Sequence, residues 1–276
     1  MIPSLIRKFH KVILSRNLWD IIKFLIILGI IYWIISTGSD KLNYNWQWYR
    51  VKQFLYTFDQ GSFTVGPLLQ GLWVTLKITF FSLFLALALG LTTSIFRLSN
   101  SMVAGLVART YVEVIRNTPL LIQLLFNYFV LSPILGISPF MTAVLTLSLF
   151  EGAYASEIIR AGIQSIDKGQ WEAAQSSGLN RMQTYFYIII PQAYRFLVPP
   201  LTNQSVSLVK DSALVSTIAI YDLTMQGQVI ISNTFLTFEI WFTVAAIYLA
   251  VALIITLVVS ILEKRLQGKK VPVKTF

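Results

Sequence analysis

A single acidic side chain lies deep inside one of the long apolar stretches of this sequence. Glu151 is near the middle of residues 140–159, and Tyr154 and Ala155 follow it by three and four residues. That spacing places side chains on one face of a helix, so the three residues are predicted to border one cavity. Placing a charge inside a membrane costs about 2.5 kcal/mol or more on insertion scales, which marks Glu151 as a functional candidate. Its carboxylate pairs either with the ammonium group of a ligand or with a lysine of another stretch.

A second group of polar side chains interrupts residues 194–220. Asn203, Lys210 and Asp211 lie in this segment. The two charged residues either meet the oppositely charged groups of a ligand or neutralise each other across a turn. Lys210 is also, with Lys77, one of the two lysines that would neutralise the buried carboxylate.

Other charges have simpler structural explanations. Glu157 and Arg160 are three residues apart near the end of an apolar stretch, which favours a local ion pair. Arg116 comes three residues before Pro119, which is predicted to kink its helix.

The sequence lacks the side chains of the common catalytic and cofactor sites. It has no cysteine and one histidine, His10, so it cannot form a His-Glu-x-x-His zinc site. No Gly-x-x-x-x-Gly-Lys-Ser/Thr loop cradles nucleotide phosphates, and no Gly-x-Ser-x-Gly elbow presents a nucleophile. We therefore expect neither an enzyme nor a cofactor in this chain.

The elements that position the candidate residues are predicted to be membrane helices. Of the 276 residues, 55% are hydrophobic and 12% charged, and the mean hydropathy is +0.68, which excludes a soluble domain. A helix needs about 20 apolar residues to cross a bilayer. Five stretches have this character: 18–35, 72–96, 106–131, 140–159 and 238–262. The polar segment 194–220 is predicted to be a sixth crossing that faces protein or water rather than lipid.

The basic residues predict the orientation of these crossings. Fifteen of the 22 Lys and Arg residues fall in four segments: 1–17, 97–109, 160–195 and 263–276. Cytoplasmic loops are enriched in such residues, so both termini are predicted to be cytoplasmic and nucleic-acid binding is not needed to explain the net charge. Residues 37–71 are then external, and Trp46, Trp48, Tyr49 and Tyr56 suit a membrane interface.

The cytoplasmic loop 160–195 carries a helix-terminating pattern. A short polar helix is predicted to begin near Lys168 and to end at Gly178, because glycine leaves a helix easily through a left-handed conformation. Pro191 is predicted to stop the following helix from extending backwards. A short helix held between two membrane helices is suited to be gripped by a partner.

Residues 172–191 read Glu-Ala-Ala, three residues, Gly, nine residues, Ile, one residue, Ile, Pro. This pattern resembles the signature of the permease subunits of ATP-binding-cassette importers, with Ile190 in place of Leu. Three further segments resemble the polar amino acid branch of that family: 116–123, 151–163 and 210–216. The resemblance covers about residues 65–265.

The resemblance implies an all-α integral membrane protein with six transmembrane helices. Residues 65–265 would form a five-helix type I permease core with a coupling helix at about 168–180. Residues 1–64 would add a basic segment, an extra crossing and an external segment, and residues 266–276 a basic cytoplasmic tail. The location would be the bacterial plasma (inner) membrane.

The resemblance also implies partners. A separate subunit would bind ATP and Mg and hydrolyse the nucleotide, a second identical or related permease would complete the pathway, and an external binding protein would deliver a polar amino acid. The residues that couple to the ATPase would be Gly169, Glu172, Ala173, Ala174 and Gly178. The alternative for Glu172 is a solvated charge on a helix face. Glu151 would pair with the substrate amino group, and the other expected pathway residues are Tyr154, Asn203, Lys210 and Asp211.

Two other classes of protein compete with this interpretation. A transporter driven by an ion gradient usually shows inverted repeats and paired broken helices, whereas this sequence shows one interrupted crossing and no repeat. A membrane-embedded enzyme would need convergent catalytic groups, which the sequence does not supply.

Overall fold

The computed structural model describes residues 19–30, 32–33, 44–59 and 62–267. The chain divides into two compact units, residues 1–47 and 48–276. In the first unit, residues 19–30 are helical and their side chains are exposed. Parts of the predicted crossing 18–35 and the whole basic segment 1–17 lie outside the described residues.

The second unit begins with short elements and a β-hairpin. The turn η1 (Trp48–Arg50) and helix α2 (Lys52–Leu55) lead into β1 (Tyr56–Asp59) and β2 (Ser62–Val65). The two strands are antiparallel, with Phe58 opposite Phe63. The prediction of an all-helical chain is therefore wrong here, because alternating aromatic and β-branched residues favour strands. The described part of the chain is mostly helical.

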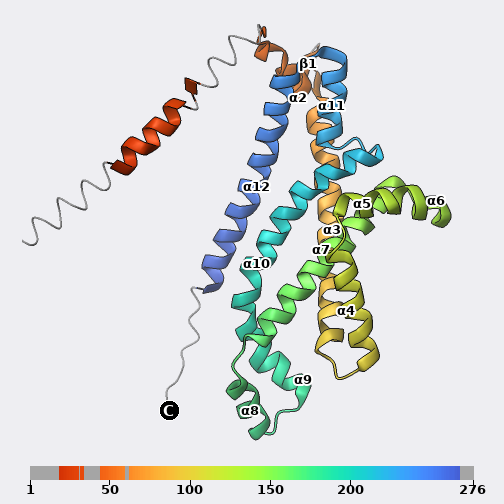
Figure 1. The fold of residues 1–276 in the computed structure, drawn as a ribbon, viewed down its shortest axis with the longest axis vertical. Coiled ribbons are helices and arrows are strands. Elements are labelled where there is room, and N and C mark those ends of the chain that lie inside the picture. The colour runs from red at the N-terminus through yellow and green to blue at the C-terminus, as the bar shows by residue number, and fades with distance from the viewer. Residues whose placement is uncertain (1–18, 31, 34–43, 60–61, 268–276) are drawn as a thin grey trace, which may run out of the picture. The chain divides into compact units, whose positions relative to one another are not determined.

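Two long helices form the centre of this unit. Helices α3 (Pro67–Leu98) and α7 (Pro139–Gln164) pack along each other (Figure 1). Their approach depends on small residues: a Cβ added at Gly90 would lie 2.7 Å from the Cβ of Ala155. Hydroxyl groups also bridge the helices, since Ser148 Oγ donates to the carbonyl oxygen of Ser82 at 3.3 Å. Small residues and hydroxyls of this kind hold membrane helices together.

Among the described residues, two helices are long and apolar enough to cross a membrane, at Pro67–Leu98 and Thr237–Ile261. The second belongs to α12 (Thr237–Gln267), and only 6% of its apolar window is buried, which suits a helix that faces lipid. Two bent helix pairs raise the number of candidate spans to as many as four. Helix α7 is not among them because Glu151 and many small polar residues lower its hydropathy, and those residues are buried against other helices.

The predicted crossing 106–131 is not one continuous helix. Helix α4 (Met102–Arg116) ends before Pro119, and the chain then turns by 103° into α5 (Leu120–Phe126), the π-helical η2 (Asn127–Leu131) and α6 (Ser132–Leu135). Proline lacks the N–H of a helical hydrogen bond, so the predicted kink is realised as a full break.

The remaining helices follow α7. They are α8 (Lys168–Ser176), α9 (Arg181–Gln183), the π-helical η3 (Thr184–Ile189), α10 (Ile190–Asp211), the 3-10 helix η4 (Ser212–Ile218) and α11 (Leu223–Thr234). Pro191 does not stop the helix, contrary to the sequence prediction. The wider turns of η3 directly precede it, and they remove the clash that proline makes with the preceding turn of a regular α-helix.

The buried core lies where α3, α7 and α10 meet the ends of the shorter helices. One cluster contains Ile78, Leu147, Leu208 and Val215. A second one, beneath α8, contains Ile159, Ile163, Ile166, Ile189 and Ala193. Leu208 of the first cluster lies next to the candidate carboxylate Glu151, and Trp171 of α8 packs against the second cluster.

Candidate functional site

Helix α8 ends as its sequence predicts. Gly178 has φ +76°, in the left-handed region, directly after the helix. Its N–H donates to the carbonyl oxygen of Gln175 at 2.9 Å, and the N–H of Leu179 donates to that of Ala174 at 3.1 Å. These two bonds form a Schellman motif, which satisfies the last carbonyl groups of the helix.

The start of α8 is equally well defined. Asp167 is the N-cap, and its Oδ1 accepts the backbone N–H of Gly169 at 2.7 Å. A Cβ added at Gly169 would lie 2.9 Å from that same oxygen, so a larger residue would disturb the cap. Both ends of the short helix are therefore fixed by local hydrogen bonds.

The two sides of α8 have different surroundings. Ala174 is buried, with 4% of its surface exposed, whereas Glu172 and Ala173 are exposed. Trp171 contacts the ring of Tyr185 edge-on, with centroids 5.1 Å apart. This ring contact joins α8 to η3, so the helix presents a fixed surface at one end of the unit.

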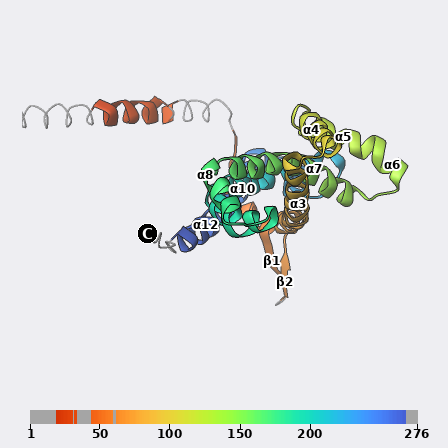
Figure 2. The ribbon, with the colours of Figure 1, turned by 90° about the horizontal axis from the view of Figure 1, so that it is seen from below.

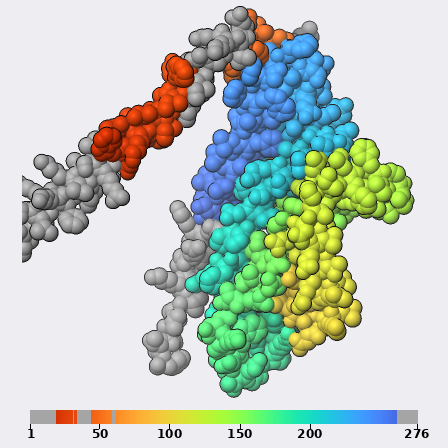
Figure 3. Space-filling view, in the orientation of Figure 1, coloured from red at the N-terminus to blue at the C-terminus, as the bar shows by residue number. Residues whose placement is uncertain are grey.

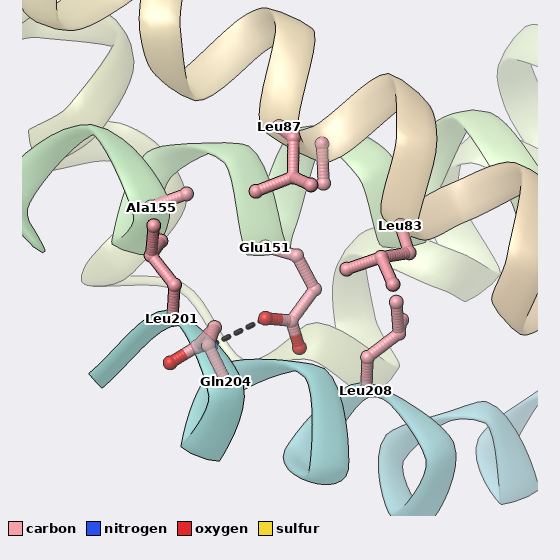
Figure 4. Close-up of a pocket in the computed structure, with 8 residues that line it drawn as sticks. Leu83, Leu87, Glu151, Ala155, Leu201, Gln204 and Leu208 are labelled. Atoms are coloured by element: carbon pink, nitrogen blue, oxygen red, sulfur yellow. Dashed lines mark hydrogen bonds between the residues drawn. The ribbon is translucent and has the colours of Figure 1, made fainter. Parts of the chain in front are cut away.

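Glu151 lies between three helices. It is 2% exposed, and its carboxylate extends from α7 toward α10 (Figure 4). The side-chain amide of Gln204 on α10 donates to its Oε2, while its Oε1 has no hydrogen-bond partner among the described residues. A small cavity surrounds this group, lined also by Leu83, Ala86, Leu87, Ala155, Leu201 and Leu208. The carboxylate thus retains an unfilled acceptor in an apolar setting.

The carboxyl group of Asp211 interacts with that of Glu151. Asp211 lies on the last turn of α10, and the interaction is electrostatic. Lys210 influences Asp211 through its charge, but the two residues form no ion pair in the described part of the chain. The predicted neutralisation across a turn is therefore not a direct contact. Two neighbouring carboxylates repel each other, and either a shared proton or a bound cation relieves this repulsion.

The lysine partners considered for Glu151 do not contact it. Lys77 is exposed, and its ammonium group lies 5.2 Å from the centroid of the Trp73 ring. Lys210 is exposed as well, and so is Asn203. Of the predicted pathway residues, the structure therefore brings Glu151 and Asp211 together.

Tyr154 lies apart from the Glu151 cavity, although Ala155 lines it. The guanidinium carbon of Arg116 is 5.0 Å from the centroid of the Tyr154 ring, a cation–π contact. Tyr154 also contacts Phe150, with ring centroids 5.1 Å apart. The prediction that these residues border one cavity with Glu151 is therefore confirmed for Ala155 and wrong for Tyr154.

The predicted ion pair between Glu157 and Arg160 is confirmed. Arg160 Nη2 lies 2.7 Å from Glu157 Oε2, and its Nε donates to the same oxygen at 3.1 Å. Arg97 of α3 forms a further ion pair with Glu157, and Arg116 of α4 lies 3.8 Å from it. One carboxylate thus ties three helices together.

Sequence reasoning missed two of these partners. Gln204 contacts Glu151 directly. The sequence indicated this residue only as a polar amide inside a predicted membrane crossing. Arg97 pairs with Glu157 across 60 residues of sequence, which no local spacing rule could predict.

Comparisons with known proteins identify the family to which this chain belongs. The sequence profile of the binding-protein-dependent transport system inner membrane component family matches residues 83–268. The chain is 39% identical over 203 residues to the glutamine transport system permease protein of Escherichia coli K12, covering 72% of this chain and 93% of the relative. It is 40% identical over 204 residues to the L-cystine transport system permease protein of Bacillus subtilis 168, covering 72% and 87%.

Solved structures of transporters have a similar fold. The structure is similar to a crystal structure of an amino acid ABC transporter with histidines, at a TM-score of 0.68 and 40% identity, covering 72% of this chain and 94% of that one. A methionine ABC transporter in an inward-facing conformation shares the fold at a TM-score of 0.65 and 20% identity. The resemblance predicted from residues 172–191 is confirmed. The chain belongs to the family of binding-protein-dependent transport system inner membrane components, the permease subunits of ABC importers whose ATPase is a separate subunit, and within it to the polar amino acid branch.

Proposed function

We propose that this chain is the membrane-spanning subunit of an ATP-driven importer that carries polar amino acids, and that α8 is the element by which a separate ATPase drives it. The observation that carries this proposal is the construction of α8. The helix is capped at both ends, packed through Trp171 and Ala174, and exposed at Glu172 and Ala173. A rigid helix with one exposed face transmits a displacement rather than absorbing it.

Within α8, we assign the docking contact to Glu172 and Ala173. Gly169 and Gly178 shape the two ends of the helix, and Ala174 seats it against the rest of the unit. Trp171 and η3 then connect the docked helix to α10, which carries Gln204 and Asp211. A movement of α8 would thereby change the surroundings of Glu151.

We infer that the substrate ammonium group binds between Glu151 and Asp211. Gln204 holds one oxygen of Glu151, and the other oxygen points into the small cavity without a partner among the described residues. A cation there would relieve the unfavourable pairing of two carboxylates. Amino acids carry an ammonium group, and the relatives named above include glutamine and cystine permeases. We also propose Tyr154, Asn203 and Lys210 as pathway residues, although they do not line the cavity at Glu151.

We propose six crossings with both termini in the cytoplasm, a core at residues 65–265, an extra crossing within 1–64 and a basic tail at 266–276. Support comes from the distribution of Lys and Arg, because the basic loop 160–195 contains α8. With this orientation, α8 faces the compartment that holds ATP. The opposite end of the unit, where α3 begins, faces the external binding protein.

A second permease subunit is proposed to cover α5, η2 and α6. These elements protrude from the unit (Figure 3), and they carry exposed apolar side chains: Ile122, Phe126, Phe129, Val130, Ile134 and Leu135. The neighbouring break leaves Arg116 and Asn117 exposed. Irregular backbone and charge at membrane depth are stable only against protein or water, so contact with lipid alone would not suffice.

Co-purification tests this assignment of α8. We expect the tagged chain, extracted in mild detergent, to bring an ATPase subunit with it, and Glu172→Arg to abolish that association. Glu113→Arg is a matched control, because it reverses the charge of another exposed carboxylate outside α8 and should leave the association intact. Recovery of the same ATPase with Glu172→Arg would contradict docking through α8.

A further inference from the structure

The paired strands β1 and β2 form a hairpin that has two chemically different faces. Side chains alternate along a strand, so the register places Tyr56, Phe58, Phe63 and Val65 on one face. Their rings contact one another: Phe58 and Phe63 are 5.2 Å apart between centroids, and Tyr56 and Phe63 are 6.0 Å apart. The opposite face carries Thr57 and Thr64, whose hydroxyl groups are hydrogen-bonded to each other. The hairpin is amphipathic.

The aromatic face is not covered by the rest of the described unit. Phe58 is 69% exposed and Phe63 is 56% exposed. Figure 2, which looks along the long direction of the helices, shows the hairpin extending sideways beyond α3. An isolated two-stranded hairpin is marginally stable in water, so an exposed aromatic face on one calls for a partner.

The hairpin is joined closely to a membrane helix. Gly66 separates β2 from α3, and a Cβ there would lie 2.7 Å from the carbonyl carbon of Leu55. The Gly66 N–H donates to the Leu55 carbonyl oxygen at 2.8 Å, and Gln70 Nε2 donates to the Val65 carbonyl oxygen at 2.7 Å. Because α3 is long and apolar enough to span a bilayer, the hairpin stands at one end of a candidate membrane span.

We propose that this hairpin is an interfacial anchor, which inserts its aromatic face at the boundary between headgroups and acyl chains of the outer leaflet. Aromatic side chains favour that layer, and the sideways direction keeps the hairpin close to the membrane surface. At its base, the ammonium group of Lys52 lies 5.3 Å from the centroid of the Tyr56 ring, where it can also meet lipid phosphate. The anchor holds the first turn of α3 at a constant depth. This inference rests on the proposed orientation of α3.

Because the sequence has no cysteine, a single cysteine introduced into the hairpin can be labelled selectively. Single variants Phe58→Cys, Phe63→Cys and Thr64→Cys each give one reactive thiol, because the chain has no other. Each full-length variant, purified with its partner subunits, is nitroxide-labelled and reconstituted in vesicles of phosphatidylethanolamine and phosphatidylglycerol. Electron paramagnetic resonance then measures how often each nitroxide collides with oxygen, which concentrates in lipid, and how often it collides with a water-soluble nickel chelate.

We expect the ratio of oxygen to nickel accessibility at positions 58 and 63 to exceed that at position 64 several-fold. High nickel accessibility at positions 58 and 63 would place the aromatic face in water and overturn the proposal. Low accessibility to both reagents, or immobilisation when the external binding protein is added, would show a protein contact and overturn it as well. ATP-dependent uptake by the same vesicles reports separately on the proposed function.

Discussion

Gly178→Val is expected to reduce ATP-dependent uptake by at least about tenfold, a loss of about 1.4 kcal/mol of coupling. Gly178 has φ +76°, a conformation that costs an ordinary residue about 1–2 kcal/mol and a β-branched one more. Nothing among the described residues lies within 4 Å of a Cβ added at position 178, so the substitution creates no clash at that atom. The expected damage is therefore confined to the Schellman exit of α8. Uptake and ATP hydrolysis by the reconstituted complex measure it.

Gly136→Val is the matched control. Gly136 also has a positive φ, +64°, and no described atom within 4 Å of an added Cβ, but it ends α6 rather than α8. Because α6 belongs to the proposed contact with the second permease subunit, assembly of the complex is checked for this variant before its uptake is measured. Both variants should lower the melting temperature to a similar extent, because both replace a left-handed glycine. Only Gly178→Val should uncouple ATP hydrolysis from uptake. Equal losses of uptake in the two variants would show that backbone strain in general, not the shape of α8, limits transport.

Glu151→Gln is the second variant with a large expected effect. The substitution keeps the shape of the side chain and one acceptor oxygen for the Gln204 amide, but it removes the charge and replaces the other oxygen by an NH2 donor. If the substrate ammonium group binds this carboxylate, uptake at low substrate concentration should fall by at least about tenfold, since removing one partner of a buried charge pair costs about 2 kcal/mol or more. The apparent KM of substrate uptake should rise.

Ser148→Ala tests whether such an effect is specific. Ser148 is buried on the same helix, one turn earlier, and its hydroxyl bonds the carbonyl oxygens of Ser82 and Val144. Its loss should lower stability by about 1 kcal/mol, the usual net value of a hydrogen bond, with the KM for substrate unchanged. A Glu151→Gln variant that transports with an unaltered KM would remove Glu151 from the substrate pathway.

The elements fixed by local chemistry were predictable from sequence. The end of α8 follows from glycine at position 178, and the spans at α3 and α12 follow from long, mainly apolar stretches. The break after α4 was predicted only as a kink. Hydropathy averages over the turn at Pro119, so it cannot separate one straight crossing from two helices at 103°.

Contacts between distant segments were not predictable. The partner of Glu151 is an amide 53 residues away rather than one of the lysines, because helix packing decides which face of α10 meets α7. The hairpin was missed for another reason: its strands are four residues each, too short to stand out inside a segment already assigned to the membrane interface. Tyr154 was predicted beside Glu151 from spacing alone, yet it packs against Arg116.

The source of energy is the central claim, and uptake by sealed vesicles tests it most directly. Vesicles containing the full complex receive a labelled polar amino acid and the external binding protein outside, with either ATP trapped inside or an imposed ion gradient. We predict uptake that requires internal ATP and persists when ionophores dissipate all gradients. Uptake driven by an ion gradient without ATP would contradict the account and identify a secondary transporter instead.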